Sequence, residues 1–360
     1  MTDDFTARLG VQLREAALRE ERRGPVLRAL RTARPRPAAA LGAFATAVAA
    51  GGVVLVAVLL GSPAPETATP TGPRVVANIP LGSGFNGGAR AAFGSVWLSD
   101  SGRGAILRVD PRTRRVTARI PVGSEVALET GDGAVWAIPR GAGNQGGSLL
   151  RIDPRSARTV ARIPLRTLKG DVFPAAALLA GRRVWVLGPT GGIGVDPARN
   201  RVVSEIHLGG SFPVTDAIVH DGELWLTRAD HTITRFDART GRRLGAVRWR
   251  TDAFLLPFAD KLIAMSRTSV ALVDPGTGRA LWRTRIGTSL ELDELSAGRL
   301  FLEGSDGSAG GRGRVWELDV HDGRVIGKAT VPEFSIVGMI RAGNGVWLLS
   351  SGGNAVVVAP

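Results

Sequence analysis

Short apolar segments return along the chain at nearly regular intervals. The clearest covers residues 94–98, where a glycine turn leads into Val-Trp-Leu. Equivalent segments are separated by 39, 49, 40, 38, 38 and 46 residues and are centred on Trp97, Trp136, Trp185, Trp225, Ile263, Phe301 and Trp347. A period of about 40 residues built from short strands is typical of β-propeller blades, so we predict seven blades.

The apolar positions in these segments are consecutive and do not alternate, as in Val96-Trp97-Leu98. Such runs are expected where both faces of a sheet are buried, as they are when blades pack face to face around an axis. The tryptophan, or its substitutes Ile263 and Phe301, is then a large side chain that fills the space between neighbouring blades.

Each repeat contains the same elements in the same order. A small-residue strand such as residues 89–93 precedes the tryptophan strand, a loop leads to a third strand such as residues 105–110, and a tight turn leads to a fourth such as residues 115–121. In the turn, Asp accepts hydrogen bonds, Pro presets φ and Gly supplies a positive φ. Six such turns are predicted, beginning at Asp110, Asp153, Asp196, Asp237, Asp274 and Asp319.

The two ends of the repeat region are incomplete in complementary ways. The last repeat has three strands and stops at residues 355–360, whereas an extra strand at residues 74–82 precedes the first repeat. We predict that this N-terminal strand completes the last blade and closes the ring, which leaves only short, protected sheet edges. The predicted fold is all-β, a seven-bladed β-propeller of four-stranded blades over residues 74–360.

Three segments precede the predicted propeller. Residues 1–37 have the pattern of a charged amphipathic helical tail. Residues 38–60 carry no charge and are long enough to cross a hydrocarbon core of about 30 Å as a transmembrane helix. Residues 61–73, rich in Pro, Thr and Ala, form a linker.

The charges around residues 38–60 predict an orientation. Nine arginines precede this segment, and only Glu66 is charged between it and Arg74. The positive-inside rule therefore predicts a single-pass protein of the cell membrane, with a cytoplasmic N-terminus and an extracytoplasmic propeller. A cleavable signal peptide is the alternative, but its charged and apolar regions are normally shorter than these.

Composition changes this picture little. The formal net charge is +14, and almost all of the cations are arginines, since Lys169, Lys261 and Lys328 are the only lysines. The arginines are spread over every repeat and do not gather into one footprint, so no nucleic-acid partner is predicted. The chain has no Cys, which excludes disulfides, thiolate zinc sites and a lipoprotein anchor.

The tryptophan strand, the Asp-Pro turn and the Ile-Pro-Val-Gly ending at residues 120–123 together resemble the YVTN/NHL-like β-propellers. Residues 271–287 also resemble a quinoprotein-type repeat, with Val-Asp-Pro-Gly-Thr-Gly followed by Leu281-Trp282. The resemblance covers nearly all of residues 74–360 and implies the architecture. It leaves the activity open, because such propellers include lyases, dehydrogenases, assembly factors and binding modules.

Two sets of loops share one face of the predicted ring: those that enter the small-residue strand and those that leave the tryptophan strand. An aromatic collar with carboxylates at the mouth of a central channel is a typical ligand site. Alternatively, the phenylalanines pack beneath the loops. The candidate ligand-binding residues are Phe85, Glu125, Asp171, Phe173, Phe212, Asp230, His231, Asp252, Phe254, Glu291, Asp293, Glu333 and Phe334.

No motif predicts catalysis. Residues 82–87 and 141–146 match Gly-x-Gly-x-x-Gly, but each leads into a strand and not into the helix that a dinucleotide site needs. The resemblance to streptogramin-type lyases implies His and Glu around Mg²⁺, yet each of the four histidines falls in a different repeat or loop. The acidic residues 291–294 are either a cation ligand set or a solvated loop. No catalytic residue, metal ligand or cofactor is predicted, and a quinone or Mg²⁺ stays open.

The sequence therefore favours a membrane-anchored extracytoplasmic propeller that binds or senses a ligand. The predicted partner is a protein, a cell-envelope polymer or a small molecule at the phenylalanine-rich face. Two alternatives stay open: an enzyme of the lyase or quinoprotein type, and a scaffold for envelope assembly that binds proteins along its blade edges.

Overall fold

A computed structural model describes residues 73–140, 147–165, 176–208, 213–248, 254–286, 289–305, 313–331 and 336–359. The chain divides into two units, Met1–Ala68 and Thr69–Pro360, and the described residues all belong to the second. The predicted tail (1–37), transmembrane helix (38–60) and most of the linker (61–73) lie outside the described residues. Within the described ranges, no helix is long and apolar enough to span a membrane.

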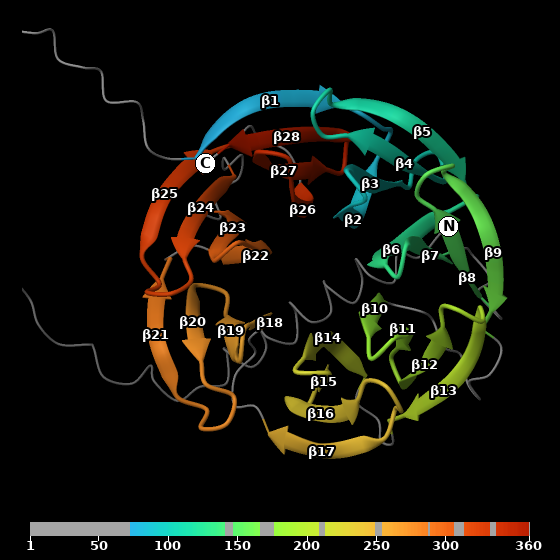
Figure 1. Cartoon of the computed structure of the whole chain (residues 1–360). Helices are drawn as coiled ribbons and strands as arrows, with labels where there is room; N and C mark the ends of the chain where they lie inside the picture. The colour runs from blue at the N-terminus through green and yellow to red at the C-terminus, as the bar shows by residue number, and fades with distance from the viewer. Residues whose placement is uncertain are drawn as a thin grey trace, which may run out of the picture. The chain divides into compact units, whose positions relative to one another are not determined.

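The described strands form seven four-stranded antiparallel sheets arranged as the blades of a ring (Figure 1). From the innermost strand outward, blades 1 to 3 are β2 (Phe85–Ala92), β3 (Ser95–Asp100), β4 (Ala105–Asp110), β5 (Arg115–Pro121); β6 (Glu125–Gly131), β7 (Ala134–Arg140), β8 (Ser148–Asp153), β9 (Arg158–Pro164); and β10 (Ala176–Ala180), β11 (Arg183–Gly188), β12 (Gly191–Asp196), β13 (Arg201–His207).

Blades 4 to 7 follow the same order around the axis. They are β14 (Val214–His220), β15 (Glu223–Arg228), β16 (Thr232–Asp237), β17 (Arg243–Arg248); β18 (Phe254–Phe258), β19 (Lys261–Met265), β20 (Ser269–Val273), β21 (Ala280–Arg285); β22 (Ser289–Ser296), β23 (Arg299–Ser305), β24 (Arg314–Asp319), β25 (Val325–Thr330); and β26 (Ile336–Ala342), β27 (Gly345–Ser350), β28 (Asn354–Ala359), β1 (Arg74–Pro80). The predicted all-β, seven-bladed fold is confirmed.

The N-terminal strand closes the ring, as predicted. β1 pairs antiparallel with β28, from Arg74 opposite Ala359 to Pro80 opposite Asn354. Just beyond this pairing, the backbone N–H groups of residues 81 and 82 donate to the carbonyl oxygen of Gly353, at 3.1 and 3.0 Å. The first and last segments of the ring therefore share one sheet, and blade 7 cannot be complete without both.

The hydrophobic core lies between consecutive blades. Trp97 of blade 1, for example, belongs to a cluster with Val126, Leu128 and Leu150 of blade 2. The largest side chains in these layers are fully buried, and they include Trp97, Trp136, Trp185 and Trp347. Both faces of the tryptophan strands are therefore covered, which explains their consecutive apolar residues.

An arginine on the third strand links some blades to the next one. Arg108 stands opposite Trp97 in the β3–β4 register, and its guanidinium carbon lies 5.7 Å from the centre of the indole. The same guanidinium donates to the carbonyl oxygen of Arg155, in the turn of blade 2, at 3.3 Å. Arg151 and Trp136 repeat the stacking at 5.5 Å, so a cation–π pair supports the junction between blades.

Blade 3 makes the same junction differently. Gly194 stands opposite Trp185, and a Cβ there would lie 3.0 Å from the indole, so no arginine fits. The indole N–H of Trp185 instead donates 2.8 Å to the carbonyl oxygen of Ala238 in the turn of blade 4. Each solution satisfies a carbonyl group in the neighbouring turn.

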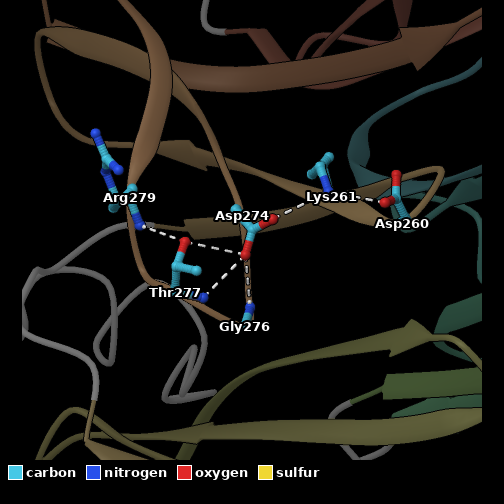
Figure 2. A network of polar contacts seen from close by, with 6 residues as sticks. All are labelled: Asp260, Lys261, Asp274, Gly276, Thr277 and Arg279. Carbon is cyan, nitrogen blue, oxygen red and sulfur yellow. Dashed lines mark hydrogen bonds and ion pairs between the residues drawn. The ribbon is translucent and has the colours of Figure 1, made fainter.

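The predicted aspartate turns are confirmed, and Asp274 shows how they work (Figure 2). Its Oδ1 accepts hydrogen bonds from the backbone N–H groups of Gly276 and Thr277, at 3.0 and 2.9 Å. Its Oδ2 accepts from Nζ of Lys261 at 3.1 Å, and Lys261 also contacts Asp260 at 2.7 Å. The Thr277 backbone N–H, and then Lys261, lower the pKa of Asp274 from 3.8 to about 2.

Every outermost strand carries a β-bulge at the same place in its blade. In each case the register with the third strand skips one residue near the start of the outermost strand. Bulges of this kind hinder pairing of an exposed edge with another chain. The skipped residues are Val76, Thr117, Val160, Val203, Leu244, Leu281 and Ile326.

Candidate functional site on the loop face

Two kinds of connection lie on one face of the ring, which we call the loop face: those from the second to the third strand, and those from the outermost strand to the next innermost strand. Of the predicted site residues, Asp171, Phe173, Phe212, Asp252, Glu333 and Phe334 lie outside the described residues. The described ones are Phe85, Glu125, Asp230, His231, Phe254, Glu291 and Asp293. These seven residues play different structural roles.

Phe85 is a core residue. It is the first residue of β2 and is only 4% exposed. It belongs to the apolar cluster between blades 7 and 1, together with Leu81, Leu98 and Trp347. The Phe85 side chain therefore packs into the core between blades 7 and 1.

Phe254, by contrast, is presented to solvent. It is the first residue of β18, stands opposite Met265 and is 59% exposed, which makes it the most exposed large apolar side chain of the described residues. An aromatic side chain at this exposure on the loop face is available for contact with another molecule.

Asp216 of β14 contacts the residue that follows Phe254, although Asp216 and Phe254 are 38 positions apart in sequence. Its Oδ1 accepts from the backbone N–H of Ala217 at 2.8 Å, and its Oδ2 from that of Leu255 at 3.5 Å. Burial raises the pKa of the Asp216 carboxyl group, while the two backbone hydrogen bonds oppose that shift. Asp216 therefore fixes the start of β18, and hence Phe254, to blade 4.

Asp230 and His231 lie on the loop face, in the tight turn between β15 and β16. His231 is exposed and has a φ of +61°, and its backbone N–H donates to the carbonyl oxygen of Arg228 at 2.9 Å. Oδ1 of Asp230 accepts from the backbone N–H of Thr232 at 3.1 Å. Burial favours a higher pKa for Asp230, but hydrogen bonds from Thr232 outweigh it and the pKa is lowered. The Asp230 carboxylate therefore caps the turn.

The remaining acidic candidates belong to innermost strands. Glu125 is the first, partly buried residue of β6. Glu291 and Asp293 lie within β22, where the register shifts between Leu290 and Leu292, and not in a loop before the strand as the acidic run suggested.

An ion pair between innermost strands was not predicted. Nη2 of Arg90 in β2 lies 3.2 Å from Oε2 of Glu129 in β6. The two residues occupy the same place in their blades, because Arg90 stands opposite Trp97 and Glu129 opposite Trp136. Aligning the repeats on their tryptophans places the two opposite charges at equivalent positions of adjacent blades, which is the sequence signal for this pair.

A second unpredicted cluster lies where blades 7 and 1 meet on the loop face. Asp100 is fully buried, and its Oδ1 accepts from the backbone N–H and hydroxyl of Ser83, at 3.2 and 2.9 Å. Its Oδ2 lies 3.7 Å from Arg103 and 3.9 Å from Arg119. These contacts tie the segment after β1 to blade 1, so we interpret them as part of ring closure.

The histidines stay apart in the described ring. His220 is buried edge-on against Trp225, with ring centres 5.3 Å apart, and His321 packs similarly on Phe258. Nowhere in the described ranges do three His, Asp or Glu side chains gather in a way that could hold a metal ion. The described residues therefore do not assemble the His and Glu arrangement that a lyase resemblance implies.

Comparison with known proteins supports a quinoprotein-repeat-like propeller, as predicted. Residues 229–359 match a PQQ-type family described as outer membrane protein assembly factor BamB. A search of curated proteins found no match.

Solved structures agree on the fold. The crystal structure of BamB from Moraxella catarrhalis has 20% sequence identity and a TM-score of 0.51, covering 77% of this chain and 83% of that one. The WD40 β-propeller domain of Doa1 has 15% identity and a TM-score of 0.61, covering 80% and 97%. BBS1N, solved in complex with ARL6DN, has 12% identity and a TM-score of 0.61, covering 79% and 95%. At these identities the likeness establishes the architecture alone.

Proposed function

We propose that this chain is a membrane-anchored, extracytoplasmic propeller that binds a protein partner of the cell envelope on the loop face, at the junction of blades 4 and 5. The observation that carries the proposal is the exposed Phe254 side chain, whose neighbour Leu255 donates its backbone N–H to Asp216 of blade 4. The uncharged stretch 38–60, with its excess of arginine on the N-terminal side, supports the anchor.

Phe254 has the properties of a binding anchor. Aromatic residues are enriched among the few side chains that dominate interface energies. The backbone beside Phe254 is already held, because Asp216 accepts the N–H of Leu255. A side chain on a fixed strand end loses less conformational entropy on binding than one on a free loop.

A protein fits this site better than a small molecule would. The Phe254 side chain is 59% exposed, whereas small-molecule sites are usually concave and lined by enclosed side chains. The match of residues 229–359 to a family described as an outer membrane protein assembly factor also favours a protein partner, and this stretch includes Phe254 and blades 5 and 6.

A photocrosslinking amino acid at Phe254 tests the site directly. Leu281 is the matched control, because it is 57% exposed but lies on the outermost strand of blade 5. We expect the full-length protein in its native cells to crosslink one envelope protein from position 254 and not from 281. Phe254→Ser should then lower recovery of that partner about tenfold, equivalent to about 1.4 kcal/mol, while Leu281→Ser should not.

The same experiment distinguishes the loop-face site from a second candidate function, a scaffold that binds proteins along its blade edges. The assembly-factor match also favours this scaffold. Crosslinks from Leu281 and none from Phe254 would support the scaffold and overturn the loop-face site.

The membrane anchor is tested by a separate experiment. Full-length protein should resist alkaline extraction from membranes and retain residues 1–37, and a mature N-terminus beyond residue 60 would contradict it.

A further inference from the structure

The rim of blades 1 and 2 carries a continuous run of exposed arginines. In Figure 1 the outermost strands β5 and β9 follow one another around the rim. Each presents two exposed arginines four residues apart, and neither strand contains an acidic residue. We call the four arginines the rim arginines: Arg115, Arg119, Arg158 and Arg162.

Most of this charge is not neutralised by the protein. In the part of the chain that the structure describes, no hydrogen bond or ion pair involves the side chain of Arg115 or Arg158. Arg162 donates only to the hydroxyl of Ser148, at 3.0 Å. Arg119 alone approaches a carboxylate, that of Asp100, at 3.9 Å, and it is still 46% exposed.

The neighbouring acidic groups are already engaged. Asp110 and Asp153, which begin the turns before β5 and β9, accept hydrogen bonds from their own turn backbones. Those bonds lower the pKa of both carboxyl groups, so both are ionised but directed into the turns.

The charge of this stretch differs from that of its neighbour around the ring. Residues 110–121 and 153–164 carry formal charges of +3 and +2, whereas the corresponding residues 196–207 of blade 3 sum to zero. There Glu205 pairs with His207 at 3.2 Å. Residues 237–248 of blade 4 and 274–285 of blade 5 carry formal charges of +3 and +2, so they match blades 1 and 2 in total charge. Blade 5 has Arg279 and Arg283 at the positions of the rim arginines relative to its bulge, and blade 6 has Arg324 and Lys328 there, but residues 319–330 of blade 6 sum to zero.

We propose that the rim arginines bind an extended polyanion, such as a phosphate-bearing polymer, that lies along β5 and β9. Guanidinium groups form bidentate hydrogen bonds with phosphates, and four exposed arginines on adjacent outermost strands offer several such contacts to a chain of anions. The curved rim also favours a flexible chain, because a flat bilayer would touch only one outermost strand at a time. This inference does not depend on the loop-face proposal.

Long-chain polyphosphate is the probe. We expect the full-length protein in neutral detergent to bind labelled polyphosphate, with an affinity that falls steeply as salt rises because counterions are released. Replacing the four rim arginines with glutamine should weaken binding at least ~10-fold and flatten the salt dependence.

A scattered variant supplies the charge-matched control. It replaces four exposed cations on the outer hairpins of blades 3, 6 and 7 with glutamine: Arg74, Arg201, Arg324 and Lys328. Retention of binding by this variant, with loss in the rim variant, supports the site. Equal loss in both would mean that only net charge matters, and binding to anionic lipid micelles but not to polyphosphate would mean that the rim meets a lipid surface. Either result overturns the proposal. Unchanged thermal unfolding of both variants confirms that each is folded.

Discussion

Single carboxyl groups perform opposite tasks in this ring. Asp274 is exposed enough to be charged and is surrounded by donors, so its pKa falls to about 2. Asp216 lies in an innermost strand, where burial raises the pKa of its carboxyl group. Asp274 stabilises the folded state as a charged carboxylate. Asp216 stabilises it because its oxygen atoms accept backbone hydrogen bonds. Their substitution should therefore change the pH dependence of stability in opposite directions.

Asp274→Asn should make the protein less stable than wild type at neutral pH. The variant should then lose less folding stability than wild type when the pH is lowered. Because the folded pKa is lowered, the stabilisation from this carboxylate is present above the unfolded pKa near 4 and is lost as pH falls towards about 2. We expect the melting temperatures of wild type and variant to differ at pH 7 and to converge by pH 2. A constant difference over this range would contradict the assignment.

Asp216→Asn should be at least as stable as wild type at pH 7. The folded pKa is raised, so the protonated group stabilises the fold below the unfolded pKa, and this contribution is lost as pH rises through the folded pKa. Asparagine keeps an acceptor for the Leu255 N–H without the buried charge. Asp216→Ala removes every acceptor and should melt lower at all pH values, so calorimetry of both variants from pH 4 to 8 tests the role.

Among the elements, the tryptophan strands carry most of the contact between blades. Trp136 is fully buried, stacks beneath Arg151, and donates its indole N–H to the carbonyl oxygen of Gly131 at 3.1 Å. Its side chain thus combines apolar burial, a cation–π contact and a hydrogen bond. This combination explains why the same residue type recurs at the same place in five of the seven repeats.

Trp136→Ala should cost about 3–5 kcal/mol of unfolding free energy, because the cavity lies between two sheets that cannot collapse together. Trp136→Phe keeps most of the apolar volume and should cost clearly less. Urea denaturation of both variants measures the difference. Similar stabilities for alanine and phenylalanine would show that the indole is not the filler between blades 2 and 3.

The sequence predicted the second and third strands of each blade better than it predicted where the innermost strands begin. The second and third strands and the aspartate turns follow from consecutive apolar residues and turn chemistry, which are local signals. The innermost strands begin earlier than expected, at Phe85 and Ser289, because register shifts there break the regular alternation of buried side chains. Two contacts between neighbouring blades, Asp216 with Leu255 and Arg90 with Glu129, each join residues 39 positions apart in sequence, so no local pattern indicates them.

At the scale of the ring, the pairing of β1 with β28 is the contact that closes it, and the arrangement of the loop face depends on that closure. Their register brings the ends of the described ring together at Arg74 and Ala359. Since the chain has no Cys, an introduced pair can report on this contact without competing disulfides.

Arg74→Cys combined with Ala359→Cys should form one disulfide on oxidation and raise the melting temperature, reversibly on reduction. A crosslink that closes so long a loop is worth up to about 4–5 kcal/mol in the chain-entropy model. Arg74→Cys with Asn354→Cys is the mismatched control, because these residues lie at opposite ends of the pairing. Disulfide formation in the control and not in the matched pair would disprove the register.

The pairing of β1 with β28 also determines when, during synthesis of the chain, the ring can close. β1 leaves the ribosome before any other strand of the ring, yet its hydrogen-bonding partner is made last. The first strand therefore stays without this partner until the strands of all seven blades have been synthesised, and a chain that stops before β28 cannot close the ring. Closure thus depends on synthesis of every blade.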